Sequence, residues 1–313
     1  MVQKPKMKIL VAGCSGFIGR NFLELAPKDT EIIGIYHSSE DIESFVKEKN
    51  LKNVKLCKCD LTKEDEVKSL FEKIGKKFDC CLYLVANVNV PLSKKNPKRD
   101  AELTIFTLLN FMQSCESVNR LVYLSTSGVY DGNKGIVTPE TKLSPVVPYC
   151  ISKVAAEQYV KFYASTGKIK DYVIIRFGGA FGPYSERKFM TSLVNDICVN
   201  NKKEIEVYGD GTNIINVMYV KDVIKALFVA LSSSKSNITC NLGQENMSVK
   251  ETVERVAKAF NKDVNIKYTP KIMNQKYITF KIKVDFNDIF NFKPDYSFEQ
   301  GIKEFEKELK NGS

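Results

Sequence analysis

The strongest constraint on the fold of this chain is a regular alternation of short apolar runs with stretches of helical periodicity. The expected strands are residues 8–12, 31–36, 54–59, 80–85, 120–125 and 172–177. The expected helices between them are residues 17–25, 41–49, 63–74, 101–115 and 149–165. Parallel strands need crossover connections, which are usually helical, so the alternation predicts an α/β fold with a doubly wound parallel sheet. Ligands of such sheets bind at the carboxyl ends of the strands.

The alternation ends after Arg176, where Gly178, Gly179, Gly182 and Pro183 interrupt the chain. Two strand-like runs follow at residues 205–208 and 214–220, and helical patterns follow at residues 223–232, 249–260 and 298–309. We therefore expect a first domain at residues 1–176, with a return segment around residues 213–243. Residues 177–313 are expected to form mainly a smaller, substrate-binding lobe.

Composition excludes several classes of protein. Hydrophobic residues make up 43% of the chain and charged residues 27%, which is typical of an ordinary globular protein. No run approaches the ~20 apolar residues that span a bilayer, and the first residues lead straight into a strand rather than a signal-peptide core. We expect a cytoplasmic protein without a membrane partner. Nine cysteines without paired C-x-x-C spacing predict small buried thiols and no metal site.

The net charge of +10 would suit an anionic ligand or a nucleic acid. However, only six of the 47 basic residues are arginines, and the lysines are scattered over helical faces such as residues 63–77. We interpret this charge as a solvated, lysine-rich surface, and we expect no nucleic-acid partner.

A glycine-rich turn joins the first expected strand to the first expected helix. Gly13, Gly16 and Gly19 are spaced G-x-x-G-x-x-G in this turn. Glycines allow a tight turn and let the backbone approach a pyrophosphate, and a helix N-terminus offers free N–H groups. Because the turn opens a long strand-helix alternation, we interpret residues 1–176 as a dinucleotide-binding domain.

The end of the second strand indicates which dinucleotide is bound, because an acidic side chain there accepts from the ribose 2′-hydroxyl and repels a 2′-phosphate. Here the strand runs into His37, Ser38 and Ser39, without a carboxylate at that place. These side chains can donate to a phosphate, with Arg20 as a cationic partner, so we expect NAD(P) and favour NADP. His37 is equally open to a role as an exposed turn residue. Asp60, after the third strand, either accepts from the adenine amino group or caps the next helix.

The sequence offers little for histidine-based catalysis, because its one histidine lies at the nucleotide end. Tyr149 and Lys153 lie one helical turn apart, which puts the phenol and the ammonium on one face. A neighbouring ammonium stabilises a phenolate and so lowers a tyrosine pKa. Thr126 ends a strand at the carboxyl edge of the sheet, where it can hydrogen-bond the substrate oxygen that Tyr149 protonates. We predict that Thr126, Tyr149 and Lys153 are the catalytic residues.

These motifs resemble those of the extended short-chain dehydrogenase/reductase superfamily, in its branch of NAD-dependent nucleotide-sugar epimerases, dehydratases and reductases. Further markers are Asp60-Leu61, Leu84-Val85-Ala86, Ser125-Thr126-Ser127-Gly128-Val129-Tyr130, Arg176 with Gly182-Pro183, and Val207-Tyr208-Gly209-Asp210-Gly211-Thr212 before Tyr219-Val220-x-Asp222. The resemblance covers nearly the whole chain and implies a Rossmann fold with a smaller C-terminal lobe. It also implies a homodimer formed through the helices expected at residues 101–115 and 149–165.

The resemblance implies roles for the matching residues. Tyr149 would be the acid/base, Lys153 would hold the nicotinamide ribose and lower the tyrosine pKa, and Thr126 would be the supporting hydroxyl while hydride passes between nicotinamide and a sugar carbon. Cofactor contacts are expected at Gly13, Ser15, Gly16, Phe17, Ile18, Gly19, His37, Ser38, Ser39, Asp60, Leu61, Val85, Ala86, Tyr149, Lys153 and Phe177. Substrate contacts are expected at Thr126, Ser127, Gly128, Gly179 and Lys188.

The substrate half departs from the family pattern. Ser127-Gly128 stands where the 4,6-dehydratases carry an Asp-Glu pair, which removes the acid and base needed for water elimination. Arg176-Phe177-Gly178-Gly179 replaces Arg-Pro-x-Asn, so the asparagine contact to substrate is absent. Ile215 stands where many relatives place an arginine that grips the diphosphate, although Lys188 or Arg187 can substitute.

We therefore expect an NAD(P)-dependent epimerase or 4-keto reductase that acts on a nucleotide-activated sugar. The sequence leaves two alternatives open. One is an NADP-dependent reductase or dehydrogenase of a non-nucleotide alcohol or ketone. The other is a catalytically silent relative that binds a dinucleotide or RNA.

Overall fold

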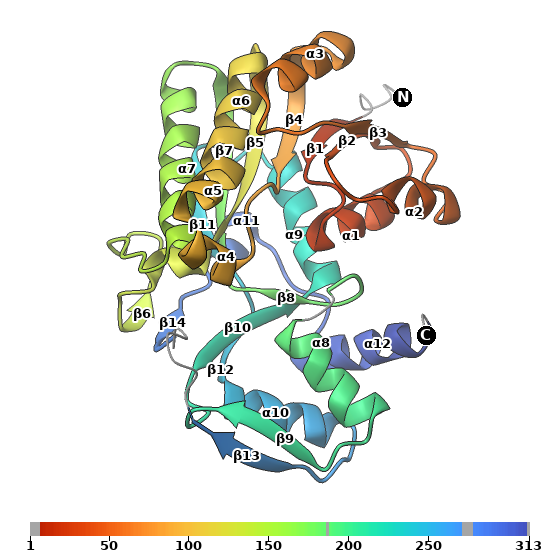
Figure 1. The fold of residues 1–313 in the computed structure, drawn as a ribbon, viewed down its shortest axis with the longest axis vertical. Coiled ribbons are helices and arrows are strands. Elements are labelled where there is room, and N and C mark those ends of the chain that lie inside the picture. The colour runs from red at the N-terminus through yellow and green to blue at the C-terminus, as the bar shows by residue number, and fades with distance from the viewer. Residues whose placement is uncertain (1–6, 186–187, 271–277, 312–313) are drawn as a thin grey trace.

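A seven-stranded parallel sheet organises the part of the chain that the computed structural model describes, residues 7–185, 188–270 and 278–311. The strand order is β11-β7-β5-β4-β1-β2-β3, so successive strands are added on one side of β1 up to β3 and on its other side from β4 onward (Figure 1). Every neighbouring pair is parallel. The expected doubly wound α/β sheet is confirmed, and the loops after β1 and β4 flank the place where such sheets bind ligands.

The strands of this sheet are β1 (Lys8–Ala12), β2 (Glu31–Tyr36), β3 (Val54–Lys58), β4 (Lys77–Tyr83), β5 (Ser117–Thr126), β7 (Ile169–Phe177) and β11 (Ile238–Leu242). The helices that connect or cover them are α1 (Phe17–Leu25), α2 (Ile42–Glu48), α3 (Glu64–Ile74), α4 (Val90–Lys95), α5 (Pro97–Ala101), α6 (Thr107–Ser114), α7 (Pro148–Ser165), α9 (Val220–Ser232) and α11 (Phe286–Phe290).

The two faces of the sheet are covered by different helices (Figure 1). On one face, apolar side chains of α3, α6 and α7 pack against the strands around Tyr83 and Phe111. On the other face, α1 and α9 pack together, and the rings of Phe22 and Phe228 stack with centroids 4.5 Å apart. Strands buried on both sides explain the nearly continuous apolar runs of the sequence.

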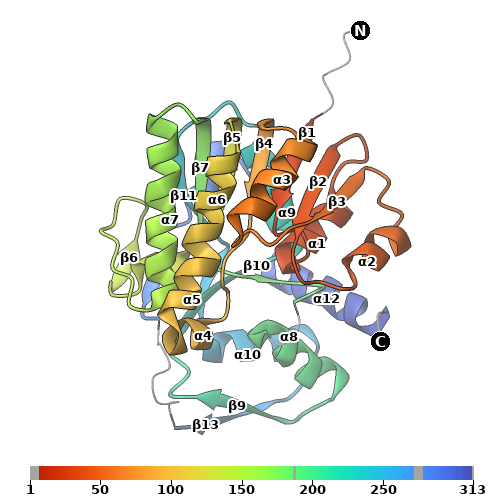
Figure 2. The ribbon, with the colours of Figure 1, turned by 45° about the horizontal axis from the view of Figure 1, so that its top comes forward.

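Much of the chain after β7 builds a smaller part below the sheet (Figure 2). Three small sheets lie there or alongside, in the pairings β12-β10-β8, β13-β9 and β14-β6. Their strands are β6 (Gly135–Val137), β8 (Ala180–Phe181), β9 (Glu204–Tyr208), β10 (Ile214–Tyr219), β12 (Glu245–Ser248), β13 (Asn265–Thr269) and β14 (Phe280–Ile282). The helices α8 (Phe189–Val194), α10 (Val249–Ala259) and α12 (Phe298–Asn311) accompany them.

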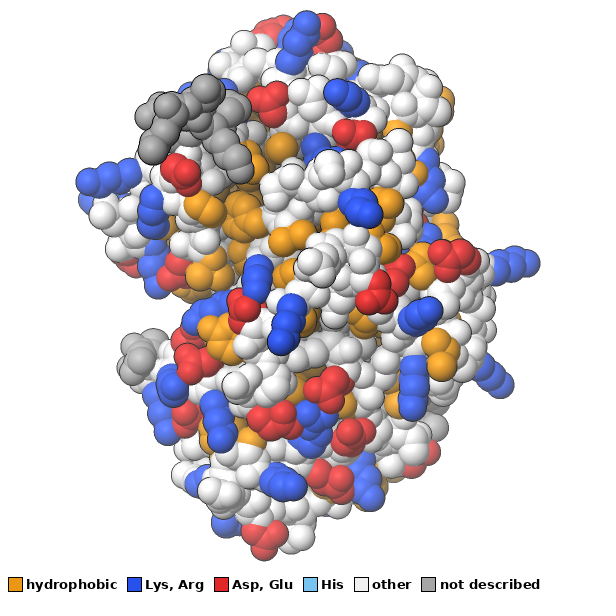
Figure 3. Space-filling model, turned by 180° about the vertical axis from the view of Figure 1, so that it is seen from behind, with side chains coloured by type: hydrophobic (Ala, Val, Ile, Leu, Met, Phe, Trp, Pro, Cys, Tyr) orange, Lys and Arg blue, Asp and Glu red, His pale blue; other side chains and the backbone are white. Residues whose placement is uncertain are grey.

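The surface seen in Figure 3 carries lysine and arginine side chains interspersed with acidic ones, as the scattered lysines of the sequence lead one to expect. Among the helices of the described residues, none combines the length and the apolar character needed to cross a bilayer.

The expected helix at residues 101–115 forms part of one unbroken helical run, but it is not α-helical throughout. α5 leads into a π-helical turn at Glu102–Phe106, and α6 follows it. π-helical turns are rare in proteins overall, but those that do occur are often found at functional sites. The turn brings Leu103 and Thr107 to the wall of the large cavity described below.

A buried ion pair ties α7 to the middle of the sheet. Arg176 Nη2 of β7 lies 2.8 Å from Glu157 Oε2 of α7, and both side chains are at most 3% exposed. Ser125 Oγ of β5 donates to Glu157 Oε1 over 2.5 Å, and Arg176 also donates to the Tyr130 hydroxyl over 2.8 Å. Removing one partner of such a pair leaves an uncompensated buried charge.

We expect the Glu157→Gln variant to lose about 3–5 kcal/mol of unfolding free energy, because it leaves the Arg176 guanidinium buried without its counter-charge. Urea denaturation measures this loss. The matched control is Glu64→Gln, which breaks an exposed pair whose 2.6 Å contact joins Glu64 to Lys68 and should cost about 0.5 kcal/mol or less. Equal losses in the two variants would contradict a structural role for the buried pair.

Candidate active site

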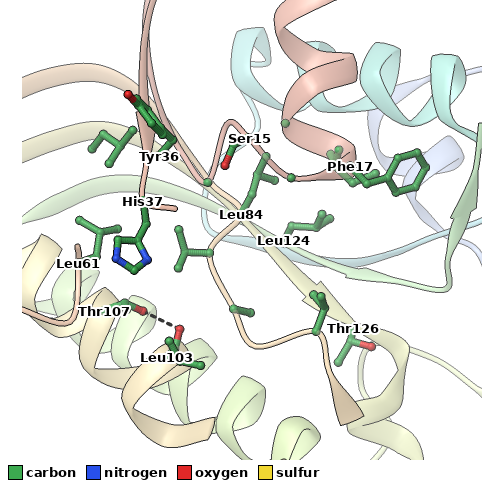
Figure 4. A pocket seen from close by; sticks show the side chains of 18 of the residues that line it. Ser15, Phe17, Tyr36, His37, Leu61, Leu84, Leu103, Thr107, Leu124 and Thr126 are labelled. Atoms are coloured by element: carbon green, nitrogen blue, oxygen red, sulfur yellow. Dashed lines mark hydrogen bonds between the residues drawn. The ribbon is translucent and has the colours of Figure 1, made fainter. Parts of the chain in front are cut away.

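A cavity of about 550 Å³ runs along the carboxyl ends of β1, β2, β3, β4, β5 and β7. His37 and Leu61 lie at one end and Thr126 lies toward the other, with Ser15 and Leu84 between them (Figure 4). The cavity therefore follows the strand ends across the point where the strand order reverses, which is where Rossmann sheets bind their ligands.

The glycine-rich turn forms one wall of this cavity. Gly13 has a left-handed φ of +86°, and a Cβ atom at Gly19 would lie 2.5 Å from the carbonyl oxygens of Gly13 and Cys14. A Cβ at Gly16 would meet nothing nearer than the Gly13 carbonyl oxygen at 3.6 Å, on the side of the turn that lines the cavity. Gly16 is also the N-cap of α1 and brings no capping side chain. The first turn of α1 thus presents its backbone N–H groups to the cavity, which fits a pyrophosphate.

Thr126, Tyr149 and Lys153 all line the other end of the cavity. Thr126 is the last residue of β5, and Tyr149 and Lys153 lie in the first turns of α7. Lys153 is only 2% exposed, and its ammonium donates to the Leu124 carbonyl over 2.6 Å and lies 4.3 Å from the centre of the Tyr123 ring. The sheet therefore fixes the position of this ammonium.

The pKa values of Tyr149 and Lys153 differ from the sequence-based expectation. Burial raises the pKa of Tyr149 above its ordinary value, and a hydrogen bond with Thr126 only partly offsets the rise. Burial also lowers the pKa of Lys153 to about 7, against the opposing influence of Glu157, Cys150 and Asp100. The expectation that Lys153 makes the Tyr149 phenol acidic is therefore wrong for this structure, because the ammonium bonds to the Leu124 carbonyl and burial dominates.

A buried polar network beside α7 escaped the sequence analysis. Asp100 is fully buried, and its carboxylate accepts from Ser152 Oγ over 2.6 Å and from Asn87 Nδ2 over 2.7 Å. The backbone N–H of Asn87 in turn donates to Thr104 in the π-helical turn over 3.1 Å. The network joins the loop after β4 to the residue next to Lys153. A buried carboxylate accepts hydrogen bonds in this way in place of water.

The far end of the cavity, after β2 and β3, carries two close side-chain pairs. His37 Nε2 lies 3.5 Å from Asp60 Oδ2. Asp60 Oδ1 accepts from the backbone N–H and the hydroxyl of Thr62, so Asp60 closes a local turn and does not cap α3, whose N-cap is Lys63. Nearby, Arg20 lies 2.6 Å from Asp41.

The cavity brings together most of the predicted site residues. It is lined by Gly13, Ser15, Gly16, Phe17, Ile18, Gly19, His37, Ser38, Asp60, Leu61, Val85, Ala86, Thr126, Tyr149, Lys153, Phe177, Gly179 and Lys188. Ser39 and Gly128 do not line it: Ser39 bonds to Arg20, and a Cβ at Gly128 would meet the Cys150 sulfur. Arg187 lies outside the described residues. The Lys188 ammonium lies 4.6 Å from the centre of the Phe17 ring.

The sequence analysis missed other lining residues, among them Ile35, Tyr36, Cys59, Thr62, Val88, Leu103, Thr107 and Ala180. Most of them adjoin strand ends and follow from the rule that ligands bind there. Leu103 and Thr107 have no such signal, since they come from the π-helical turn and the start of α6.

A second, smaller cavity of about 110 Å³ lies beside the first, and Gly178 lines both. Ser127 and two asparagines contribute polar atoms to it, while Ile214, Ile215, Val217, Ile278, Phe280 and Ile282 make its other walls apolar. Ile215, the residue that replaces the arginine of many relatives, thus borders an apolar space.

Comparison with known proteins agrees with this geometry. A model of the NAD dependent epimerase/dehydratase family matches residues 9–243. The chain belongs to this family. It is 24% identical over 316 residues to a putative UDP-glucose 4-epimerase of Methanocaldococcus jannaschii, covering 97% of this chain and 99% of that protein. It is also 24% identical to the UDP-glucuronate 4-epimerase of Thermodesulfobacterium geofontis, covering 94% of this chain and 93% of that protein.

Solved structures of family members share the fold. The UDP-glucuronic acid 4-epimerase of Bacillus cereus, in complex with UDP-glucuronic acid and NAD, superposes with a TM-score of 0.84 at 21% sequence identity. The match covers 98% of this chain and 100% of that one. The two proteins thus share one fold over nearly all of this chain.

The lowered pKa of Lys153 predicts how pH affects stability. Below pH 7 this lysine is protonated in the folded and the unfolded chain. Between its folded pKa of about 7 and its ordinary value of 10.5 the unfolded chain binds more protons, so the contribution of Lys153 to stability rises with pH. Relative to a Lys153→Met variant, the wild-type protein should gain stability by roughly 1.4 kcal/mol per pH unit from pH 7 toward pH 9.

Urea unfolding of both proteins at pH 7, 8 and 9 measures this difference. Lys134→Met, which removes an exposed lysine, is the control. Its free energy of unfolding should change with pH as that of the wild type does. A constant difference between wild type and Lys153→Met across this range would show that Lys153 titrates normally.

Proposed function

We propose that this protein is an NAD(P)-dependent enzyme that acts on a nucleotide-activated sugar, as an epimerase or a 4-keto reductase. The observation that carries the proposal is that one continuous cavity joins the glycine-rich turn to Thr126, Tyr149 and Lys153. Relatives named as epimerases of UDP-glucose and UDP-glucuronate support the substrate class. The bound dinucleotide would supply or accept a hydride at a sugar carbon.

The residues around Tyr149 suit the transfer of one proton at the sugar oxygen. Because burial raises its pKa, the Tyr149 phenol is protonated at neutral pH and ready to donate to a carbonyl oxygen. In the opposite direction Tyr149 must first lose this proton, and its phenolate form would then accept the proton of a hydroxyl. The Thr126 hydroxyl lowers the pKa of the same phenol and can hold the sugar oxygen beside it. Lys153, fixed by the Leu124 carbonyl, lies where it can orient the nicotinamide ribose.

Epimerase and reductase differ in their cofactor balance. An epimerase removes a hydride and a proton from one hydroxyl-bearing carbon and returns both to the opposite face of the transient ketone, so no cofactor is consumed. A 4-keto reductase consumes one reduced dinucleotide for each ketone. Cofactor turnover measured against product separates the two.

Tyr149→Phe tests the assignment of the proton-transfer group. The variant should lower kcat by about 10² to 10⁴-fold, since general acid–base catalysis contributes that much. It should still bind the dinucleotide, which a fluorescence titration with NADH measures. Full turnover in a variant that binds the dinucleotide normally would exclude Tyr149 from the chemistry.

The second cavity favours one alternative, a reductase or dehydrogenase of a non-nucleotide alcohol or ketone. Its walls are largely apolar, and Ile215 there offers no hydrogen bond to a diphosphate. A thermal-shift panel of UDP-, dTDP-, GDP- and CDP-sugars separates the two functions. If the lead proposal is correct, at least one of them should stabilise the protein, by about 2.7 kcal/mol at a hundredfold excess over Kd. If none raises the melting temperature, the non-nucleotide substrate replaces the lead proposal.

A further inference from the structure

A fully buried carboxylate lies beside the first turns of α7. Asp100, on α5, accepts from Ser152 Oγ over 2.6 Å and from Asn87 Nδ2 over 2.7 Å. A hydroxyl donor at so short a distance is typical of a hydrogen bond to an ionised oxygen. Both donors are neutral, so they satisfy the oxygens of Asp100 without cancelling its negative charge.

The residues bonded to Asp100 adjoin separate parts of the cavity wall. Ser152 directly precedes Lys153, and Asn87 lies between two residues that line the cavity after β4. The backbone N–H of Asn87 also donates to Thr104 of the π-helical turn over 3.1 Å. Asp100 itself does not line the cavity, so it can act on the candidate site only through these neighbours.

Lys153 is a buried cation that needs a balancing charge. Its residue is 2% exposed, and its ammonium donates to the Leu124 carbonyl and lies over the Tyr123 ring. It takes part in none of the ion pairs formed among the described residues. A buried charge is costly unless nearby groups balance it. The charges around this ammonium therefore decide whether it persists in the folded protein.

The ionisable groups that α7 and the sheet place around this ammonium carry no unbalanced negative charge at neutral pH. Burial raises the pKa of Tyr149, and it raises the pKa of the Cys150 thiol to about 12, so both keep their protons. Burial raises the pKa of the Tyr123 phenol as well. Glu157 is ionised, but its carboxylate lies 2.8 Å from the Arg176 guanidinium, which offsets its charge.

The carboxylate of Asp100 is thus left to balance the ammonium. Burial lowers the pKa of Lys153 to about 7, and Glu157, Cys150 and Asp100 oppose this fall. We propose that Asp100 is a positioning residue of the candidate site, whose buried negative charge keeps Lys153 an ammonium where it can orient the nicotinamide ribose. The contact with the ribose rests on the proposed function, whereas the charge balance between Asp100 and Lys153 does not.

Asp100→Asn tests the charge with the hydrogen bonds kept, because an amide can accept from Asn87 and donate to the Ser152 hydroxyl. Urea unfolding from pH 5.5 to pH 8 compares each background with the same background carrying Lys153→Met. In the wild-type background the difference in unfolding free energy should be constant below about pH 7 and rise above it. In Asp100→Asn the rise should begin about one pH unit lower, because loss of a neighbouring negative charge lowers the Lys153 pKa further.

Ser152→Ala separates the charge of Asp100 from its hydrogen bonding. It removes one hydrogen bond and keeps the carboxylate, so the rise should begin at the same pH as in the wild type. Asp263→Asn, which removes an exposed acidic residue between α10 and β13, is the matched control and should also leave that pH unchanged. If Asp100→Asn does not fold, Asp100→Leu with Ser152→Ala removes the charge together with a hydroxyl that would lose its partner, and it should show the earlier rise.

A rise that begins at the same pH with and without the Asp100 carboxylate would overturn the proposal. An equal shift in Ser152→Ala would also overturn it, because the hydrogen bond and not the charge would then be responsible.

Fluorescence titrations with NADH over the same pH range test the contact with the ribose. NADH binding to the wild type should weaken above about pH 7, where the ammonium loses its proton, and in Asp100→Asn it should weaken about one pH unit lower. Binding that does not change with pH would exclude the ammonium from holding the ribose. If NADH does not bind the wild type at all, the proposed dinucleotide site is wrong, and the unfolding measurements still decide the charge balance.

Discussion

The ion pair between Arg176 and Glu157 holds together the two elements on which the candidate site depends. Glu157 lies one helical turn after Lys153 on α7, and Arg176 lies on β7 just before the cavity-lining Phe177. Ser125, next to Thr126, donates to the same carboxylate. A single buried carboxylate thus connects α7 with the ends of two strands. A buried charge is costly without its partner, so displacing α7 from β7 would be strongly unfavourable.

Burial sets the protonation of Tyr149 and Lys153 more than their proximity to each other does. Tyr149 and Lys153 share one face of α7, but the strand carbonyl of Leu124 holds the ammonium. Burial pushes the two pKa values in opposite directions, toward a neutral phenol and a neutral amine, and the nearby carboxylates of Glu157 and Asp100 oppose the second change. Desolvation disfavours the charged form of either group. It therefore keeps the tyrosine protonated and makes the lysine ammonium lose its proton at a lower pH.

Much of the sheet and of the dinucleotide end could be predicted, because both have local signals. Apolar runs marked six of the seven strands of the main sheet, and the glycine spacing marked the turn. The seventh strand, β11, has no such signal, since its buried Asn241 bonds to the Tyr130 hydroxyl and to the Lys283 carbonyl and so interrupts the apolar pattern. The pairing of β6 with β14 joins residues far apart in the chain, which local patterns do not encode.

The site was predictable where it follows strand ends and not where charges meet across loops. Thr126 and the glycines follow from their places after strands. Asp41 pairs with Arg20 only because the loop after β2 turns back toward α1, and the sequence analysis therefore treated Arg20 as available. In the sequence, Asp100 likewise looks like any other acidic residue near a helix end. Its role in the network follows only from the fold, which buries it against Ser152.

Gly178 separates the two cavities with backbone alone. A side chain there would press against the Asn216 carbonyl at 2.5 Å, so the partition is thin and cannot readily be thickened. The residues beyond it, on β10, β12 and β14, contribute nothing to the glycine-rich turn. Substitutions on these strands can therefore reshape the far compartment while the glycine-rich turn keeps its structure.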